Sequence, residues 1–410
     1  MDELNFHELQ NGIRIIHKQT AGEVAHCGFI INTGSRDEKI KESGITHFIE
    51  HAIFKGTKNR KAHHILNRLD NVGGEINAYT TKENTCIYAS FTSNYFKRAT
   101  ELLTDILFNS TFPEKELEKE KDVIIDEIYS YQDSPFEQIY DDFEEQVFKN
   151  HSLGMNILGT VDSVKKIQQK NILKFIHDNY QTDQIVFSVV GNVSFKKVLH
   201  ILTQLLNHIP TKTNKLNRTN FKNYIPSNIE VKKANHQVHC ILGNQAYGAM
   251  DKKKNGFILL NNILGGPALN SRLNLEIREK YGFTYNIESS YTTYTDTGLF
   301  NIYLGTDTKH IEKSIKLVKR ELKKLREKQL TPTQLKTAKK QLIGQITLGE
   351  ESNVNVMLGM GKSILIYNKV DSIKDVHSKI ELITASELQD TANEIFDEKQ
   401  LSTLIYSIKE

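Results

Sequence analysis

The chain has 410 residues, of which 38% are hydrophobic and 25% are charged, and it contains only 6 prolines. At about 150 residues per domain, this length predicts two or three domains, and the apolar content excludes a wholly disordered protein. The formal net charge is +3, which does not give the strong positive field of a dedicated nucleic-acid binder. We therefore expect neither DNA nor RNA as a partner.

The cysteines and the N-terminal sequence indicate the compartment. Cys27, Cys86 and Cys240 are odd in number and lie in strand-like sequence, which favours small core residues over a disulfide framework. No basic region followed by an apolar run opens the chain, and no window approaches the ~18 consecutive apolar residues of a membrane span. The sequence predicts a reduced, cytoplasmic protein without a membrane partner.

The first half of the chain alternates between strand-like and helical patterns. β-Branched and aromatic residues mark the strands, spacings of three and four between apolar residues mark the helices, and Gly73 and Gly74 break the chain between two elements. In chain order we expect two strands within 12–33, a helix over 44–55, a strand, turn and strand over 75–91, a helix over 95–108, and a helix after Pro113.

The second half partly repeats this order after a polar, proline-bounded stretch at 209–228, which we interpret as a linker between domains 1–208 and 229–410. There we expect a strand at 239–242, a helix at 256–264, a hairpin over 284–305, and helices from His310 and over 330–346. An offset of 218 residues places Glu120 opposite Ala338 and Glu127 opposite Gln345. The chain thus reads as two diverged copies of one unit, of which only the first keeps both acids.

The most informative motif is His47-Phe48-Ile49-Glu50-His51, within a helical stretch. Residues four apart project from the same helix face, so both imidazoles can reach one metal ion. Glu50 lies on that face as well. This is the inverted zinc-helix pattern H-x-x-E-H, in which the acid activates water instead of binding the ion. The alternative is a helix whose histidines are satisfied by backbone or water.

A catalytic zinc usually takes three protein ligands, and Glu127 is the candidate for the third. It lies in the apolar run VIIDEI, where an acid is poorly solvated unless it is paired or metal-bound. Glu120 lies two helical turns earlier on the same stripe and is suited to orient a ligand or Glu50. For Glu120 a solvated, charge-dense helix face is an equally good interpretation. His63 and His64 are adjacent, so they point about 100° apart on a helix and form a poor ligand pair.

These motifs resemble the pitrilysin and insulinase family of zinc peptidases, which includes the mitochondrial processing peptidases, and especially its single-chain bacterial members. The family's inverted motif matches His47, Glu50 and His51, and its acidic pair spaced by seven matches Glu120 and Glu127. Further matches are the Gly-Gly-x-x-Asn-Ala segment at Gly73, Gly74, Asn77 and Ala78, and an Arg and a Tyr seven apart at Arg278 and Tyr285. The motifs occur in the family's order along nearly the whole chain.

The resemblance implies an α+β fold of two homologous domains, each a mainly antiparallel sheet flanked by helices, arranged like a clamshell around a chamber. Domain 1–208 would bind one Zn²⁺ through His47, His51 and Glu127, with Glu50 as general base and Glu120 in support. Domain 229–410 would supply Arg278 and Tyr285, which would bind the substrate and stabilise the oxyanion. The implied assembly is a homodimer, or a heterodimer with a paralogue.

The implied activity is that of a zinc endopeptidase acting on short or unfolded peptides. The segment with Gly74, Asn77 and Ala78 would bind such a peptide as an added strand at a sheet edge. Taken alone, the two glycines also fit a tight turn, and Arg278 and Tyr285 also fit ordinary surface residues. A second functional hypothesis is a non-catalytic peptide-binding or assembly subunit of the same fold, against which the intact set of metal-binding residues argues.

Overall fold

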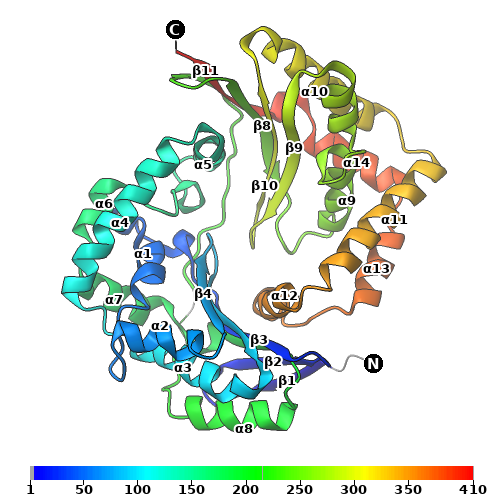
Figure 1. Ribbon diagram of the computed structural model, residues 1–410. Coiled ribbons are helices and arrows are strands. Elements are labelled where there is room, and N and C mark those ends of the chain that lie inside the picture. The colour runs from blue at the N-terminus through cyan, green and yellow to red at the C-terminus, as the bar shows by residue number, and fades with distance from the viewer. Residues whose placement is uncertain (1–3, 215, 410) are drawn as a thin grey trace. The chain divides into compact units, whose positions relative to one another are not determined.

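The computed structural model describes residues 4–214 and 216–409, so residue 215 of the predicted linker lies outside the described residues. Each predicted strand and helix is present (Figure 1), with extensions at several ends, whereas the helix predicted over 44–55 is shorter and covers only Ile45–Ala52. The strands are β1 Leu4–Glu8, β2 Arg14–Gln19, β3 Val24–Ile31, β4 Glu75–Thr80, β5 Thr85–Thr92, β6 Ile185–Gly191, β7 Asn228–Lys233, β8 Val238–Ala246, β9 Thr284–Thr293, β10 Gly298–Thr306 and β11 Ser402–Ile408.

The α-helices of the first half are α1 Ile45–Ala52, α2 Ala62–Asp70, α3 Phe96–Asn109, α4 Glu114–Gln132, α5 Pro135–Val147, α6 Val161–Lys166, α7 Gln169–Asn179 and α8 Phe195–Leu206. Those of the second half are α9 Lys254–Gly265, α10 Ile311–Glu327, α11 Pro332–Gly349, α12 Asn353–Tyr367, α13 Ile373–Glu381 and α14 Ala385–Ile395. Within the described residues, no helix combines the length and the apolar character needed to span a membrane.

The chain forms two compact units that are discontinuous in sequence. Unit 1 comprises the chain up to Tyr129 together with Met155–Arg218 and Gly349–Val370. Unit 2 comprises Ser130–Gly154, Thr219–Leu348 and the chain from Asp371 on. The domains expected from the sequence are continuous segments, and their boundaries stay a prediction.

The two units contain sheets of the same topology. The strand order is β1-β2-β6-β3-β5-β4 in unit 1 and β7-β11-β8-β10-β9 in unit 2. In each sheet one pair is parallel, β2 with β6 and β7 with β11, and the remaining pairs are antiparallel. Apart from the extra strand β1, the second order reproduces the first. The expected α+β fold with two mainly antiparallel sheets flanked by helices is therefore confirmed.

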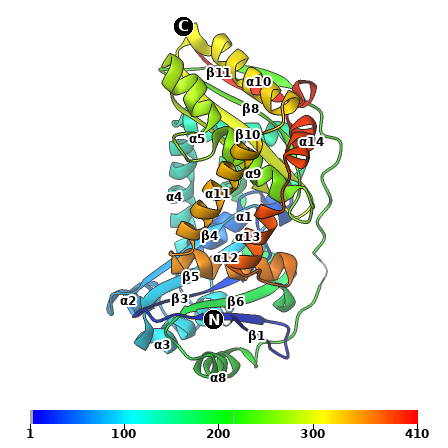
Figure 2. The same cartoon turned by 90° about the vertical axis from the view of Figure 1, so that its right-hand side faces the viewer.

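Helices cover both faces of the sheet in unit 1. Alternate residues of β6 point to opposite faces, so Phe187 joins a core with α1, α3 and α8, whereas Val186 and Val190 join a core with α12. The α12 helix packs against β3 and β6, beside which it is labelled in Figure 2. Gly361 allows this close approach, because a Cβ there would lie 2.4 Å from the Cδ1 atom of Ile30.

Unit 2 is built in the same way, with helices α9, α10 and α14 against one face of its sheet and α5 against the other. Phe143 and Phe148 from the α5 region pack with Ile241, Tyr303 and Tyr406 of the strands. Each half of the sequence therefore contributes one helix to the unit that is built mainly from the other half. The helix from the first half is α5, and the helix from the second half is α12.

The predicted linker contains no helix or strand among its described residues before β7 begins at Asn228, but it is anchored to unit 1 by Arg218. The Arg218 guanidinium donates to both carboxylate oxygens of Asp37, at 2.8 and 2.7 Å, and to the side chain and carbonyl of Asn32. It also donates to the Glu83 carbonyl at 3.0 Å. The Arg218 and Asp37 side chains are only 12% and 5% exposed, so this ion pair is largely shielded from water.

Replacing Arg218 with Met should lower the free energy of unfolding by about 3 kcal/mol, because breaking a buried pair leaves the Asp37 carboxylate without its partner. Urea denaturation followed by circular dichroism measures this loss. Lys222→Met removes the same charge from an exposed linker position and is the control. Equal midpoints for the two variants would contradict the anchoring role.

Candidate metal centre and peptide-binding edge

Helix α1 carries the motif residues and is fixed in place by its apolar face and its N-terminal end. Ile45, Phe48 and Ile49 are fully buried in the core of unit 1. At the N-terminal end, the buried Glu38 carboxylate accepts hydrogen bonds from the Gly44 and Thr46 amides, both at 2.8 Å, and from the Thr46 hydroxyl at 2.6 Å. A carboxylate at this end also suits the helix dipole.

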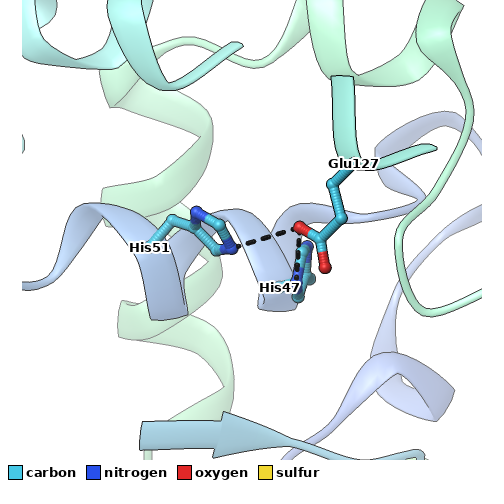
Figure 3. A group of neighbouring side chains, drawn as sticks. All are labelled: His47, His51 and Glu127. Carbon is cyan, nitrogen blue, oxygen red and sulfur yellow. Dashed lines mark ion pairs between the residues drawn. The ribbon is translucent and has the colours of Figure 1, made fainter. Parts of the chain in front are cut away.

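The structure brings His47, His51 and Glu127 together. One carboxylate oxygen of Glu127, from α4, points between the two imidazoles (Figure 3). Glu127 Oε2 lies 3.7 Å from His47 Nε2 and 3.4 Å from His51 Nε2. The ligand atoms of the three side chains all lie within 4.8 Å of one another, in the only such group among the described residues that could hold a metal.

These distances fit a shared metal ion better than direct hydrogen bonds. Two ligands on a tetrahedral zinc with bonds of about 2.0–2.2 Å lie about 3.3–3.5 Å apart, whereas N–H···O hydrogen bonds are about 2.7–3.2 Å long. Burial, and then the neighbouring His51, lower the pKa of His47 to about 4, so its imidazole is neutral at pH 7, as a metal ligand must be. The residues present therefore suit zinc.

Glu120 contacts the His51 ring nitrogen that faces away from Glu127, and a lysine forms an ion pair with Glu120. Glu120 Oε2 lies 3.3 Å from His51 Nδ1, and Glu120 Oε1 lies 2.5 Å from the ammonium of Lys55. The Glu120 side chain is 9% exposed, so it does not belong to a solvated helix face. A carboxylate on the second nitrogen of a metal-binding histidine fixes the ring and its tautomer. Sequence reasoning missed Lys55, although it lies one turn beyond His51.

Glu127 is less buried than its apolar neighbours suggested. The structure buries Ile124 and Ile128, but the Glu127 side chain is 31% exposed and Val123 on the same helix is 49% exposed. The acid lies at the margin of the buried stripe, where solvent reaches it.

Glu50 lies on α1 beside the His/Glu group and close to the end of β4. Burial raises the pKa of its carboxyl, and the neighbouring Thr80 and His51 counteract part of the rise. Glu50 lies three residues after His47 on the same helix, and its carboxyl is within electrostatic reach of His51 and Glu127. The Glu50 carboxyl interacts electrostatically with His51 and Glu127, and its role as a general base stays a prediction.

The Gly-Gly-x-x-Asn-Ala segment spans the turn before β4 and the first four residues of that strand, which is the edge strand of the sheet in unit 1. Gly73 has φ 72°, a conformation that glycine adopts without strain, and Gly74 is buried just before the strand. Asn77 and Ala78 pair with Tyr88 and Ile87 of β5. Among the described strands, β4 pairs only with β5, so its other edge is open to an added strand.

Arg278 and Tyr285 lie next to each other in unit 2. Arg278 belongs to a short π-helical segment, Asn274–Glu279, and Tyr285 is the second residue of β9. The guanidinium carbon lies 5.6 Å from the centroid of the Tyr285 ring, and Tyr285 is 88% exposed. The structure thus joins these two residues to each other, and it places the remaining site residues in unit 1.

Family models cover most of the chain. Residues 14–161 match the model described as insulinase, peptidase family M16, and residues 166–342 match the model described as the peptidase M16 inactive domain. A protein of Bacillus subtilis named as the uncharacterized zinc protease YmxG is 32% identical over 399 residues, which is 97% of this chain and 96% of the relative. The chain belongs to the insulinase family of peptidases, family M16.

Other relatives agree with this assignment. A protein of Rickettsia felis, also named as an uncharacterized zinc protease, is 32% identical and aligns over 98% of both chains. A crystal structure of a protease from Helicobacter pylori superimposes with a TM-score of 0.90 at 22% identity, covering 99% of this chain and 100% of that one, and it supports the fold. The resemblance deduced from the motifs is confirmed as a single-chain bacterial M16 type.

The Glu38 contact with α1 should make stability depend on pH. Burial raises the Glu38 pKa to about 8, although the Thr46 and Gly44 hydrogen bonds favour the ionised form. The folded state then holds a proton that the unfolded state releases above pH ~4.3, so stability falls as pH rises from about 5 to 8, by up to about 1.4 kcal/mol per unit. Glu38→Gln should lose less stability over this range in thermal melts. Parallel curves for the two proteins would contradict the raised pKa.

The Lys55 contact should matter for metal affinity. Lys55→Met removes the cation that pairs with Glu120, so Glu120 orients the His51 ring less firmly. We therefore expect zinc to bind about 10-fold more weakly, as is typical when a residue that supports a metal ligand is lost. Competition with a fluorescent chelator measures the dissociation constant. Lys55→Arg should restore most of the affinity, and Lys58→Met, at an exposed position nearby, should not change it. An unaltered constant in Lys55→Met would rule out the role.

Proposed function

We propose that this protein is a zinc-dependent endopeptidase that hydrolyses short or unfolded peptides. The observation that carries the proposal is the convergence of His47, His51 and Glu127 within 4.8 Å, with Glu50 on the same helix beside the open edge of β4. The family assignment and the relatives named as zinc proteases support it.

In this proposal, His47, His51 and Glu127 hold one zinc ion per chain. When bound, zinc supplies a Lewis acid that makes water nucleophilic near neutral pH and polarises the peptide carbonyl. Glu120 and Lys55 keep the His51 ring oriented with its Nε2 atom toward Glu127. The supporting carboxylate fixes the proton on Nδ1 and leaves the Nε2 lone pair free.

Glu50 acts as the general base: it takes a proton from the attacking water and returns it to the leaving amine. The backbone of β4 around Asn77 and Ala78 binds the peptide as an added strand, which gives affinity that depends little on sequence. Arg278 and Tyr285 donate hydrogen bonds to the substrate carbonyl and to the oxyanion as it develops. Their proximity to each other in unit 2 suits a joint role.

The assembly proposed for this activity is a homodimer, because one chain carries both the metal-binding group and the Arg/Tyr pair. A heterodimer with a paralogue is the alternative. Light scattering coupled to size-exclusion chromatography distinguishes a dimer from a monomer. The cytoplasmic location stays a prediction from the sequence.

Glu50→Gln should abolish peptide cleavage while zinc stays bound. Losing a general base costs about 10²–10⁴-fold in rate, and the amide leaves the three metal-binding side chains in place. Digestion of a mixed peptide library by mass spectrometry measures the rate, and elemental analysis measures zinc. Glu114→Gln makes the same change at an exposed position of α4 and should cleave like the wild type.

Two outcomes would contradict the proposal. Equal cleavage by Glu50→Gln and the wild type would remove Glu50 from the mechanism. The second outcome concerns protein that has never been exposed to a chelator. If this protein contains no zinc and cleaves no peptide, the result would favour the non-catalytic peptide-binding subunit.

A further inference from the structure

Lys362 is a cation beside the open edge of β4 that neither the fold nor the proposed mechanism uses. It belongs to α12, which is fixed on the sheet of unit 1 by the Ser188 hydroxyl donating to the Met357 carbonyl at 2.6 Å and by the close approach of Gly361 to Ile30. The position next to Gly361 is therefore held near the sheet, although it lies almost 300 residues after β4 in the sequence.

The Lys362 ammonium faces the aromatic surface at the end of β4. Its nitrogen lies 5.0 Å from the centroid of the Tyr79 ring, and Tyr79 packs edge-to-face on Tyr88 of β5. Tyr79 pairs in register with Cys86, whose thiol also lies within electrostatic reach of the ammonium. Among the described residues, no carboxylate lies within ion-pair distance of Lys362. A half-buried lysine thus faces the ring of Tyr79 instead of an acid.

Side chains of β4 alternate between two environments. Ile76 and Ala78 point to the core that includes α1, and Tyr79 points to the core that includes α12. A peptide added at the open edge of β4 continues this alternation, so every second side chain lies on the Tyr79 face. The side chain opposite Tyr79 lies about 5 Å from it between Cβ atoms and within reach of the Lys362 ammonium.

We propose that Lys362 selects peptides with an acidic side chain at the position opposite Tyr79. The inference rests on the proposed function for the location of the peptide on β4, and it adds a substrate class, namely peptides with Asp or Glu at one defined position. A carboxylate there meets an unpaired cation on a partly dry surface, where a charged hydrogen bond is stronger than in water. Lys362 is thus a specificity-determining residue supplied by the second half of the chain.

The test separates binding from cleavage. Short extended peptides of alternating Ala and Thr, labelled with a fluorophore, carry one Asp, Asn or Lys at each position in turn. Their anisotropy with the zinc-loaded Glu50→Gln protein should show one position, or positions two apart, where Asp binds about 10-fold more tightly than Lys, a difference of about 1.4 kcal/mol.

Adding Lys362→Glu should reverse the preference at that position alone. Lys97→Glu makes the same charge change at an exposed position of α3, the helix on the other face of the sheet, and should leave the preference intact. If the preference is absent, or is the same with Lys362→Glu, the inference is overturned.

Cleavage of the same peptides by the wild type tests the proposed function independently. Peptides that bind with a preference dependent on Lys362 but are never cut would refute the peptidase assignment and leave the recognition role standing. If the peptides are cleaved and the charge preference of cleavage is the same with Lys362→Glu, the peptidase function is supported and the role of Lys362 in recognition is refuted. Peptides that neither bind nor react would refute both.

Discussion

The structure depends on one electrostatic constraint: two carboxylates of α4 face two imidazoles of α1 with too little positive charge between them. Burial keeps His47 neutral, so Lys55 is the cation that contacts the group through Glu120. Core packing and the Glu38 cap hold α1 in place, and α4 cannot rotate its acids away without exposing Ile124. In the function proposed above, a divalent cation held by His47, His51 and Glu127 would offset this imbalance.

Sequence reasoning recovered the parts of the site that depend on local spacing. The separation of four residues placed His47 and His51 on one helix face, helical patterns predicted α1 and α3, and Pro113 predicted the start of α4. Contacts between segments that are distant in sequence could not be predicted from local spacing. Nothing local pairs Lys55 with Glu120, and the amphipathic pattern of a helix such as α12 does not say which sheet it covers. The exposure of Glu127 was also misjudged, because an apolar neighbourhood in sequence need not be buried.

The second unit keeps the scaffold and lacks the metal-binding chemistry. Its sheet repeats the strand order of the first, yet Ala338 and Gln345 of α11 stand where the offset places Glu120 and Glu127. Ala338 is 8% exposed and packs into the core of unit 2, so the position that holds an acid in α4 serves packing in α11. This agrees with the match of residues 166–342 to the inactive domain of the family. Arg278 and Tyr285 lie in this second unit.

Helices α5 and α12 each pack in the unit that is built mainly from the other half of the chain. A gene cut at the linker would yield two fragments, and each would present a bare hydrophobic sheet surface where the missing helix belongs. Because α5 completes a core of unit 2 and α12 completes a core of unit 1, each half of the chain needs the other half to cover its sheet.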